Sequence, residues 1–406
     1  MRPQRTRLVP AIMAMTVITL SLPSMGRQDE APAEVTVAVR VFDGGTFVDG
    51  LSLADFELQE DGVLQRIDAI FRVDKNAVVR QEGQGPAPDT ARRFHLLFQM
   101  YEYNPKVSEA LRYFFNNALL PGDTLEIQTP VKSYMLTAQA FSQKPKDLLA
   151  KEMDEIVRKD INKGNFVYTS LIKELRRLVN AIQGSNPLAG GEDSSAGMVS
   201  YFGLEQILDQ YRDSLAKLEA QQSLDQNKII AFAQALKKQS GRKFLFFFYQ
   251  QEYRPEISTQ ALNTLIDNNQ DRQSVLADLH ELFQIYHRNI SLDVGKIVQA
   301  YCDSGAAVNF LFMKRTPEKL GGISMREQSE DVFKLFSQVA VATGGIAETT
   351  QSPLAEIRAA VEAMEACYLL TYTPTPAVKD GTFRRISVRV KGKPYKVLYD
   401  QGYIAR

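Results

Sequence analysis

The chain has 406 residues, 44% of them hydrophobic and 24% charged, so it is long enough for two globular domains and is not biased towards disorder. Lys and Arg together number 48, as do Asp and Glu, so no net field attracts nucleic acid or an anionic membrane. We therefore expect no nucleic-acid partner.

The first 26 residues have the pattern of a secretory signal. Arg2, Arg5 and Arg7 give a positive start, an apolar run covers residues 8–22, and Ser24-Met25-Gly26 supplies small residues for a signal peptidase. The apolar run is short for a membrane span, and an uncleaved anchor is the alternative. We expect cleavage after residue 26, an extracytoplasmic (periplasmic or secreted) mature chain, and no stable membrane span after cleavage.

Residues 33–80 have the pattern of a small β unit. Valine recurs at every second position from 35 to 41, which is typical of a half-buried strand, and Asp61-Gly62 predicts a hairpin turn. Such a unit is too small to be stable alone. Residues 81–91 are rich in Gly, Gln and Pro, which predicts a linker.

From residue 92 to residue 373, apolar strands alternate with helical periodicity. This predicts an α/β domain with a doubly wound, mostly parallel sheet and helices on both faces. The strands Phe94–Phe98 and Lys243–Tyr249 are apolar without alternation, so both faces of each should be covered. Helical periodicity from about residue 145 to about residue 240 predicts a long helical insertion within this domain. The strand Cys367–Tyr372 falls inside the expected boundary of the same domain.

Residues 380–406 alternate again as strands. We expect this segment to pack with residues 33–80 in one small β-sandwich, so that the α/β domain is inserted between its two halves. An independent terminal tail is the alternative. The two cysteines, Cys302 and Cys367, lie in apolar runs, which favours two buried free thiols over a disulfide.

Polar and aromatic residues follow the two most apolar strands directly. They are Gln99, Tyr101, Glu102, Tyr103, Gln250, Glu252 and Tyr253. Ligands of open α/β sheets bind at the carboxyl ends of the strands, so we expect the functional site here. Tyrosine offers a large contact area with a polar tip, which favours a protein-recognition rim. The alternative is that these residues only cap strand ends.

Sequence signals for catalysis are weak. His95 lies inside a strand, His280 and His287 lack the His-Glu-x-x-His spacing, and the chain contains no Gly-x-Ser-x-Gly motif. We expect no enzyme activity, no catalytic residue and no cofactor. A hydrolase that uses His95 with an unseen nucleophile is a weak alternative.

Several stretches resemble a known family. The stretch Gly50–Gly62, the run Tyr368–Pro374 followed by Asp380–Val390, and the late Ala342-Thr343-Gly344-Gly345 look like parts of von Willebrand factor type A proteins. The resemblance covers nearly all of the mature chain and is greatest to the VWFA-related exported proteins of Acidobacteria and similar bacteria. It implies a type A fold and an extracytoplasmic location.

Type A domains commonly bind a divalent cation at a metal-ion-dependent adhesion site, whose first motif is Asp-x-Ser-x-Ser. By this resemblance the motif falls on Gln99-Met100-Tyr101-Glu102-Tyr103, the threonine loop falls on Gly164-Asn165-Phe166, and a strand that usually ends in Asp ends in Tyr249-Gln250-Gln251. Mg²⁺ prefers hard oxygen ligands that include a carboxylate, and these residues supply amides and phenols instead. We therefore expect no metal at this site.

Together these features predict an exported, non-enzymatic protein–protein interaction module with a degenerate, metal-free adhesion face. Its partner would be an unidentified envelope or secreted protein. The competing hypothesis is a cation-dependent adhesion domain that uses Glu102 or Glu252 in an unconventional site.

Overall fold

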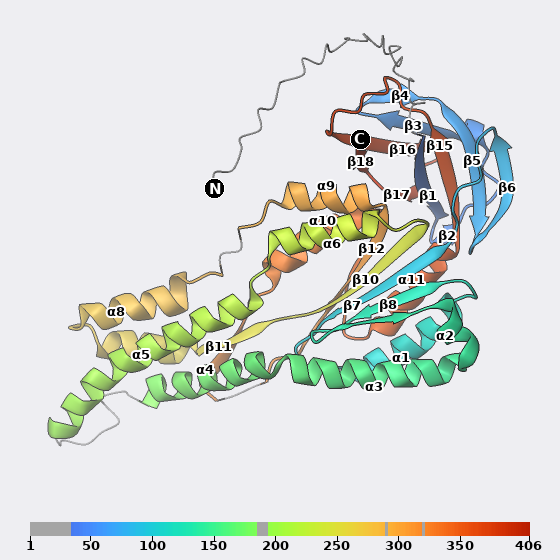
Figure 1. The fold of residues 1–406 in the computed structure, drawn as a ribbon. Coiled ribbons are helices and arrows are strands. Elements are labelled where there is room, and N and C mark those ends of the chain that lie inside the picture. Colours follow the sequence, from blue (N-terminus) through green and yellow to red (C-terminus); the bar gives the residue numbers. More distant parts are fainter. Residues whose placement is uncertain (1–33, 185–193, 289–290, 319–320) are drawn as a thin grey trace, which may run out of the picture.

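A computed structural model describes residues 34–184, 194–288, 291–318 and 321–406 of the chain (Figure 1). The expected signal segment, residues 1–26, lies outside the described residues. Helices and strands are both abundant, and a six-stranded sheet contains the parallel strands. The expectation of an α/β chain with a mostly parallel sheet is confirmed.

The central sheet has the strand order β14-β12-β10-β7-β8-β9. Its strands are β7 (Arg92–Gln99), β8 (Thr124–Gln128), β9 (Ser133–Leu136), β10 (Arg242–Gln250), β12 (Ala306–Met313) and β14 (Ala347–Thr350). Neighbouring strands run parallel, except that the edge strand β9 is antiparallel to β8. Numbered along the chain, this is the doubly wound order 3-2-1-4-5-6, in which the winding direction reverses between the first and fourth strands. Here that reversal lies between β7 and β10.

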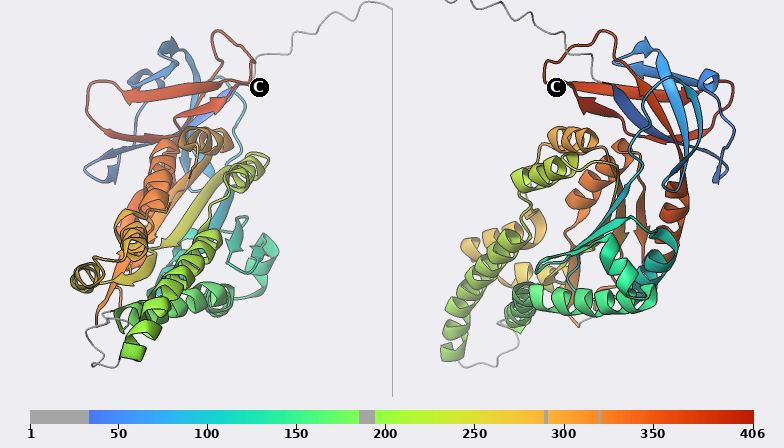
Figure 2. Two further views of the ribbon diagram at one scale, coloured as in Figure 1. Left: turned by 90° about the vertical axis from the view of Figure 1, so that its left-hand side faces the viewer. Right: turned by 45° about the vertical axis from the view of Figure 1, so that its right-hand side comes forward.

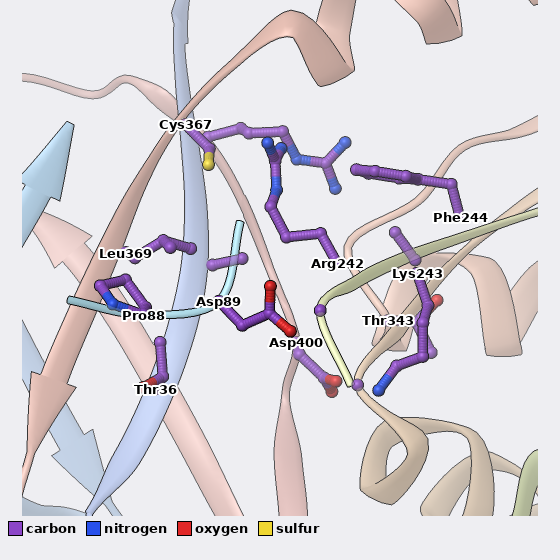
Figure 3. Close-up of a pocket in the computed structure, with 15 residues that line it drawn as sticks. Thr36, Pro88, Asp89, Arg242, Lys243, Phe244, Thr343, Cys367, Leu369 and Asp400 are labelled. Carbon is purple, nitrogen blue, oxygen red and sulfur yellow. The ribbon is translucent and has the colours of Figure 1, made fainter. Parts of the chain in front are cut away.

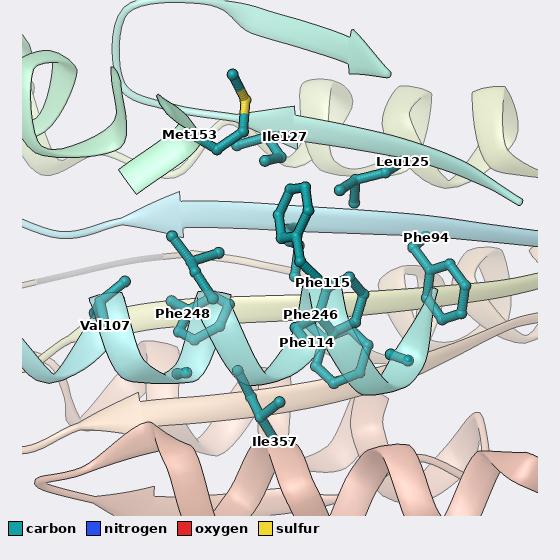
Figure 4. Packing of buried hydrophobic residues seen from close by; sticks show 14 of the residues in the cluster. Phe94, Val107, Phe114, Phe115, Leu125, Ile127, Met153, Phe246, Phe248 and Ile357 are labelled. Carbon is teal, nitrogen blue, oxygen red and sulfur yellow. The ribbon is translucent and has the colours of Figure 1, made fainter. Parts of the chain in front are cut away.

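Helices cover both faces of the central sheet. One face packs against α1 (Lys106–Tyr113), the π-helical turn η2 (Phe114–Ala118), α3 (Lys146–Gly164) and α11 (Pro353–Glu365), as Figure 4 shows for the phenylalanines of β7, β10 and η2. The other face packs against α6 (Gln226–Lys237), α9 (Val294–Ser304) and α10 (Glu330–Ala342). Every residue of β10 is buried, which explains why its sequence shows no alternation.

A separate helical lobe lies beyond the carboxyl ends of the central strands (Figure 1). It consists of α4 (Phe166–Gly184), α5 (Ser194–Gln222), α7 (Thr259–Asn268), α8 (Gln273–His280), the π-helical turn η4 (Glu281–Ile285) and the small antiparallel pair β11 (Tyr253–Ile257) and β13 (Ile323–Glu327). The short helix α2 (Ala138–Gln143) follows β9.

The expected long insertion is therefore divided in the structure. Of the helices between residues 145 and 240, α3 and α6 cover the central sheet, because their apolar faces pack on opposite sides of it. Only α4 and α5 extend away to form the lobe. Helical periodicity reports that a helix has one apolar face and does not report which surface that face contacts.

Strands from both ends of the chain form a two-sheet sandwich (Figure 2). One sheet has the order β17-β1-β15-β5-β6, with the short β2 beside β1, and the other has the order β18-β16-β3-β4. The bounds of these strands are β1 (Val35–Asp43), β2 (Thr46–Phe47), β3 (Phe56–Glu60), β4 (Val63–Gln65), β5 (Ile67–Asp74), β6 (Ala77–Gly83), β15 (Ala366–Tyr372), β16 (Phe383–Val390), β17 (Lys396–Tyr399) and β18 (Gly402–Ile404). A 3₁₀ turn, η1 (Leu53–Asp55), precedes β3.

Two expected boundaries differ from the structure. The strand at Cys367–Tyr372 was expected inside the α/β domain, but β15 lies between β1 and β5 in the sandwich. A fully buried strand has the same apolar composition in a sandwich as in a parallel sheet, so its sequence does not decide between them. The expected linker 81–91 is also shorter, because residues 81–83 belong to β6 and pair with β5.

Two glycines allow close backbone contacts, Gly345 within the α/β domain and Gly344 between that domain and the sandwich. A Cβ on Gly345 would lie 1.8 Å from the carbonyl oxygen of Val308 in β12. Gly344 has a φ of +69°, and a Cβ there would lie 2.8 Å from backbone atoms of Tyr399, at the end of β17. Just beyond β17, the Gln401 N–H donates a hydrogen bond of 2.8 Å to the carbonyl of Ala342. The resemblance motif at residues 342–345 therefore acts as a close backbone junction.

Cys302 and Cys367 are both buried and unbonded to each other, in agreement with the expected free thiols. Within the described ranges, no helix combines the length and the apolar composition that a membrane span needs.

Candidate functional site

The sequence-predicted site lies at the point where the winding of the central sheet reverses. Gln99 ends β7 and Gln250 ends β10, and these two strands are direct parallel neighbours. In open α/β sheets the reversal leaves a crevice outside the strand ends, which is where ligands bind. The predicted residues after β7 and β10 are therefore brought together by the strand order.

The Gln250 side chain is hydrogen-bonded to the loop that follows β7. Its carboxamide oxygen accepts hydrogen bonds from the backbone N–H groups of Tyr101 and Glu102, each at 2.9 Å. Gln250 itself is 3% exposed. A group that a ligand would use is thus already bonded to the neighbouring loop.

Glu252 is the centre of a second internal network and has no exposed surface. Its Oε1 accepts hydrogen bonds from the phenols of Tyr101 and Tyr249, and its Oε2 accepts one of 2.6 Å from Arg288. Arg288 also donates to Asp331 at 2.6 and 3.2 Å. Both carboxylate oxygens of Glu252 therefore already accept hydrogen bonds from other side chains of the protein.

Burial controls the titration of this network. It raises the pKa of the Glu252 carboxyl above its ordinary value, against the opposing charge of Arg288 and the two phenolic hydrogen bonds. Burial, together with the nearby charge of Glu252, raises the pKa of Tyr101 and Tyr249 well above the usual range for tyrosine, so both phenols remain hydrogen-bond donors.

The helical lobe covers the crevice from outside. The ring of Tyr101 lies 4.1 Å, centroid to centroid, from the ring of Tyr168 in α4. The side-chain amide of Asn165, in the loop between α3 and α4, donates a hydrogen bond to the carbonyl of Met100. The Tyr101 side chain is consequently 7% exposed and belongs to the core of the lobe.

The predicted recognition rim is therefore wrong for three of its residues. Tyr101, Gln250 and Glu252 are buried, because the lobe and the internal hydrogen bonds occupy the space that the sequence left open. Tyr103 is half-buried and its phenol donates to Asp154 in α3. The phenol of Tyr253, also half-buried, donates to the carbonyl of Arg315 at 3.1 Å.

Two predicted residues have other environments. Glu102 is accessible, with 55% of its side chain exposed, and its carboxylate pairs with Arg315 at 2.8 Å. Gln99 is half-buried, and its side chain has no hydrogen-bond partner among the described residues.

Exposed apolar side chains follow Asn165, whose side chain bonds to the carbonyl of Met100, two residues before Glu102. Phe166 is 72% exposed and Val167 is 51% exposed, both in the first turn of α4 and directly after Asn165. Val131 is 40% exposed in the loop after β8, which touches the same region because Gly164 packs on Pro130. We define Glu102, Val131, Phe166 and Val167 as the strand-end face. Large exposed apolar groups beside a charge are typical of protein-contact surfaces.

His95, the candidate base of the hydrolase alternative, is 3% exposed within β7. Its Nδ1 lies 3.0 Å from Glu126 and its Nε2 lies 3.1 Å from Gln239. Both ring nitrogens already have protein partners, so neither faces a space where a substrate could lie.

Sequence reasoning missed Tyr249, Arg288 and Asp331 as members of the Glu252 network. One signal was available: a glutamate that follows a fully apolar strand needs a buried cation. The sequence does not identify which basic residue supplies it, because Arg288 lies far from Glu252 along the chain. No cluster of three or more His, Cys, Asp or Glu that could hold a metal occurs among the residues that the structure describes.

Comparisons with known proteins give little. No protein-family model matches the chain, and no curated protein matches it. Among solved structures, the human COPII-coat protein Sec24c matches with 10% sequence identity and a TM-score of 0.29, over 80% of this chain and 44% of that one. The chain thus spans less than half the length of that structure, and at this TM-score the likeness carries no argument about fold or function.

Proposed function

We propose that this chain is an exported, non-enzymatic protein-recognition module of the von Willebrand factor type A kind. Its strand-end face would bind another envelope or secreted protein without a bound cation. The observation that carries the proposal is a filled crevice at the sheet reversal, beside an exposed apolar and charged face.

The strand order supports the type A part of the proposal. A doubly wound sheet with one antiparallel edge strand and helices on both faces agrees with the fold that the sequence resemblance implies. Asn165, in the loop that the resemblance equates with the threonine loop, contacts Met100 in the segment equated with the first adhesion motif. These segments are therefore neighbours, as the resemblance requires.

The hydrogen bonds support the cation-free part. A cation at the strand ends would need free oxygen ligands, but the Gln250 oxygen is bonded to two backbone N–H groups and the Glu252 carboxylate is bonded to two phenols and Arg288. Glu102, the accessible carboxylate of the segment, pairs with Arg315. Binding a cation would require breaking these bonds.

Export rests on the sequence of residues 1–26, which has the charge, apolar run and small residues of a secretory signal. The partner on this reading is another extracytoplasmic protein. It would present an apolar patch that fits Phe166 and Val167.

Thermal melts with and without Mg²⁺, Mn²⁺ or Ca²⁺ test the cation-free face. A tight site raises stability by RT ln(1 + [L]/Kd), about 2.7 kcal/mol at a hundredfold excess over Kd. We expect no chelator-reversible shift. A clear reversible shift that is lost in Glu102→Gln would support the competing cation-dependent adhesion domain.

Photo-crosslinking in the native cell envelope tests recognition itself. A photoreactive residue at Val167 should capture a defined partner, and Phe166→Asp should reduce that capture more than about tenfold, because a buried charge replaces an aromatic anchor. The matched control is Val341→Asp, which changes a 62% exposed valine near the opposite ends of the central strands. Equal capture by both variants would show that the strand-end face is not the contact surface.

A further inference from the structure

A cavity of about 330 Å³ lies between the sandwich and the amino-terminal edge of the central sheet. Its walls are formed by β1, β15 and the segment at Asp400 on the sandwich side, and by the first residues of β10 and β12 on the other (Figure 3). It is at the opposite end of β10 from the strand-end face. Its volume is in the range of small-molecule sites in proteins.

Three buried cations line this cavity: Arg40, Arg242 and Lys243. Their exposed fractions are 5%, 9% and 9%. Among the described residues, none of the three forms an ion pair with a carboxylate, whereas their neighbour Arg92 pairs with Asp123. Burying a charge without a counter-charge is costly, so this grouping needs an explanation.

Backbone carbonyls satisfy part of the hydrogen-bonding capacity of these cations. Arg40 donates to the carbonyl of Gly344, Arg242 donates to the carbonyls of Lys75 and Met364 at 2.7 and 3.1 Å, and Lys243 donates to Gln239 at 3.0 Å. Gly344, Met364 and Gln239 lie at the carboxyl ends of α10, α11 and α6, where cations are favourable. An arginine has five N–H donors, so Arg40 and Arg242 each keep donors for another group.

The physical cost of burial is visible in the titration of these side chains. Burial lowers the pKa of Arg40 to about 10, and it also lowers the pKa of Arg242 and Lys243. The charge of Arg242 lowers the pKa of Arg40 further. A bound anion would remove this penalty.

Two acidic residues, Asp89 and Asp400, also line the cavity, and among the described residues neither forms an ion pair with the three cations. Asp89 is exposed at its edge, and one of its carboxylate oxygens accepts a hydrogen bond of 2.9 Å from the Ala91 N–H. Asp400 has a buried carboxyl oxygen, Oδ1, without any hydrogen-bond partner. Burial raises the pKa of the Asp400 carboxyl well above its ordinary value, against the hydrogen bonds from Cys302 and Gly402 and the charge of Lys243.

We propose that this cavity binds a small organic anion, a carboxylate or phosphate monoester with a short apolar portion, through Arg40, Arg242 and Lys243. The acidic head of the ligand lies among the three cations. The apolar portion contacts Phe244, Leu369 and Ala307, which line the same cavity. Because the walls come from both domains, an occupied site joins the sandwich to the α/β domain.

Calorimetric titration of the purified mature protein tests this site. The probes are phenyl phosphate, phenylacetate and citrate, and 2-phenylethanol is the neutral control. We expect at least one of the anions to bind with one-to-one stoichiometry and a Kd of about 1 mM or lower, so that binding saturates at a ligand concentration of about 10 mM. The alcohol should not bind. Lys243→Gln should weaken that binding more than about tenfold, since it removes a charged donor.

Two further variants keep the test decisive. Ala38→Phe fills the cavity from an exposed position of β1 without removing a charge, and it should abolish binding while circular dichroism shows a native fold. Arg93→Gln changes a neighbouring cation at the same sheet edge that does not line the cavity, and it should bind as tightly as the wild type. If none of the three anions binds, or if Ala38→Phe binds them unchanged, the proposed anion site is overturned.

Discussion

At the scale of single residues, the Glu252 network is the clearest case of one charge depending on another. Glu252 has no exposed surface, and the Arg288 side chain that pairs with it is 4% exposed. An ion pair buried this deeply need not stabilise the fold relative to apolar residues, but removing one partner leaves an uncompensated charge. The network therefore holds the loops after β7 and β10 in place, but the loss of either charged partner would destabilise the fold.

Arg288→Met should lower the free energy of unfolding by about 3–5 kcal/mol at neutral pH, because Glu252 is left buried without its cation. Urea unfolding measures the change. The control is Arg177→Met, which breaks an exposed pair with Glu174 within α4 and should change stability little. Adding Glu252→Gln to Arg288→Met should recover part of the loss, and failure to recover any would contradict this account.

The sequence located this site better than it described it. Polar residues directly after apolar parallel strands are a strong indication of the functional edge of a sheet, and the structure does bring Tyr101, Gln250 and Glu252 together there. Their burial could not be predicted, because it depends on Tyr168 and Asn165, which reach the same point from the loop and helix after α3. Exposure is decided by tertiary packing and is not encoded in the residues that become covered.

At the scale of elements, β10 and β15 show where sequence patterns succeed and fail. The unbroken apolar run of β10 predicted a strand covered on both faces, and the structure has it at the centre of the parallel sheet. The run of β15 is equally apolar but pairs antiparallel with β1 and β5. The apolar composition of a strand indicates how many of its faces are buried. It does not indicate which strands are its neighbours in a sheet, because that depends on the path of the whole chain.

An alanine substitution at Gly345 tests the close backbone contact between residue 345 and β12. Gly345→Ala should destabilise the protein by about 1–3 kcal/mol, because the new Cβ would overlap the backbone carbonyl of Val308 in β12. Thermal or urea unfolding measures this change.

Gly203→Ala is the matched substitution within α5, where a new Cβ has open space. It should stabilise the protein by about 0.5–1 kcal/mol, because alanine loses less backbone entropy in a helix than glycine does. Similar effects of the two substitutions would mean that the approach of residue 345 to β12 is not a tight contact.

At the scale of the whole molecule, stability depends on pH through carboxyl groups with opposite shifts. Burial raises the pKa of Asp400, so between the ordinary value near 3.9 and the raised value the native state holds a proton that the unfolded state has lost. The stabilisation by this group is complete below the ordinary value and is lost as the pH rises through the raised value.

The free energy of unfolding of the wild type should therefore fall relative to that of Asp400→Asn as the pH rises from about 4, by at most about 1.4 kcal/mol per pH unit. Urea unfolding across this range measures the difference. Asp380 is the opposite control, since hydrogen bonds from Thr382 lower its pKa and its contribution is lost as the pH falls. Parallel profiles for wild type and Asp400→Asn would show that native Asp400 is ionised.

The place of β15 has a consequence for the order in which the chain can fold during synthesis. Its neighbours β1 and β5 are complete by Asp74, but the strand that fills the slot between them begins only at Ala366. Until then each of them presents an unpaired edge, a surface on which strands of other chains can add. A nascent chain that waits with these edges open while the whole α/β domain is made should depend on a holding chaperone, and a fragment truncated before residue 366 should aggregate.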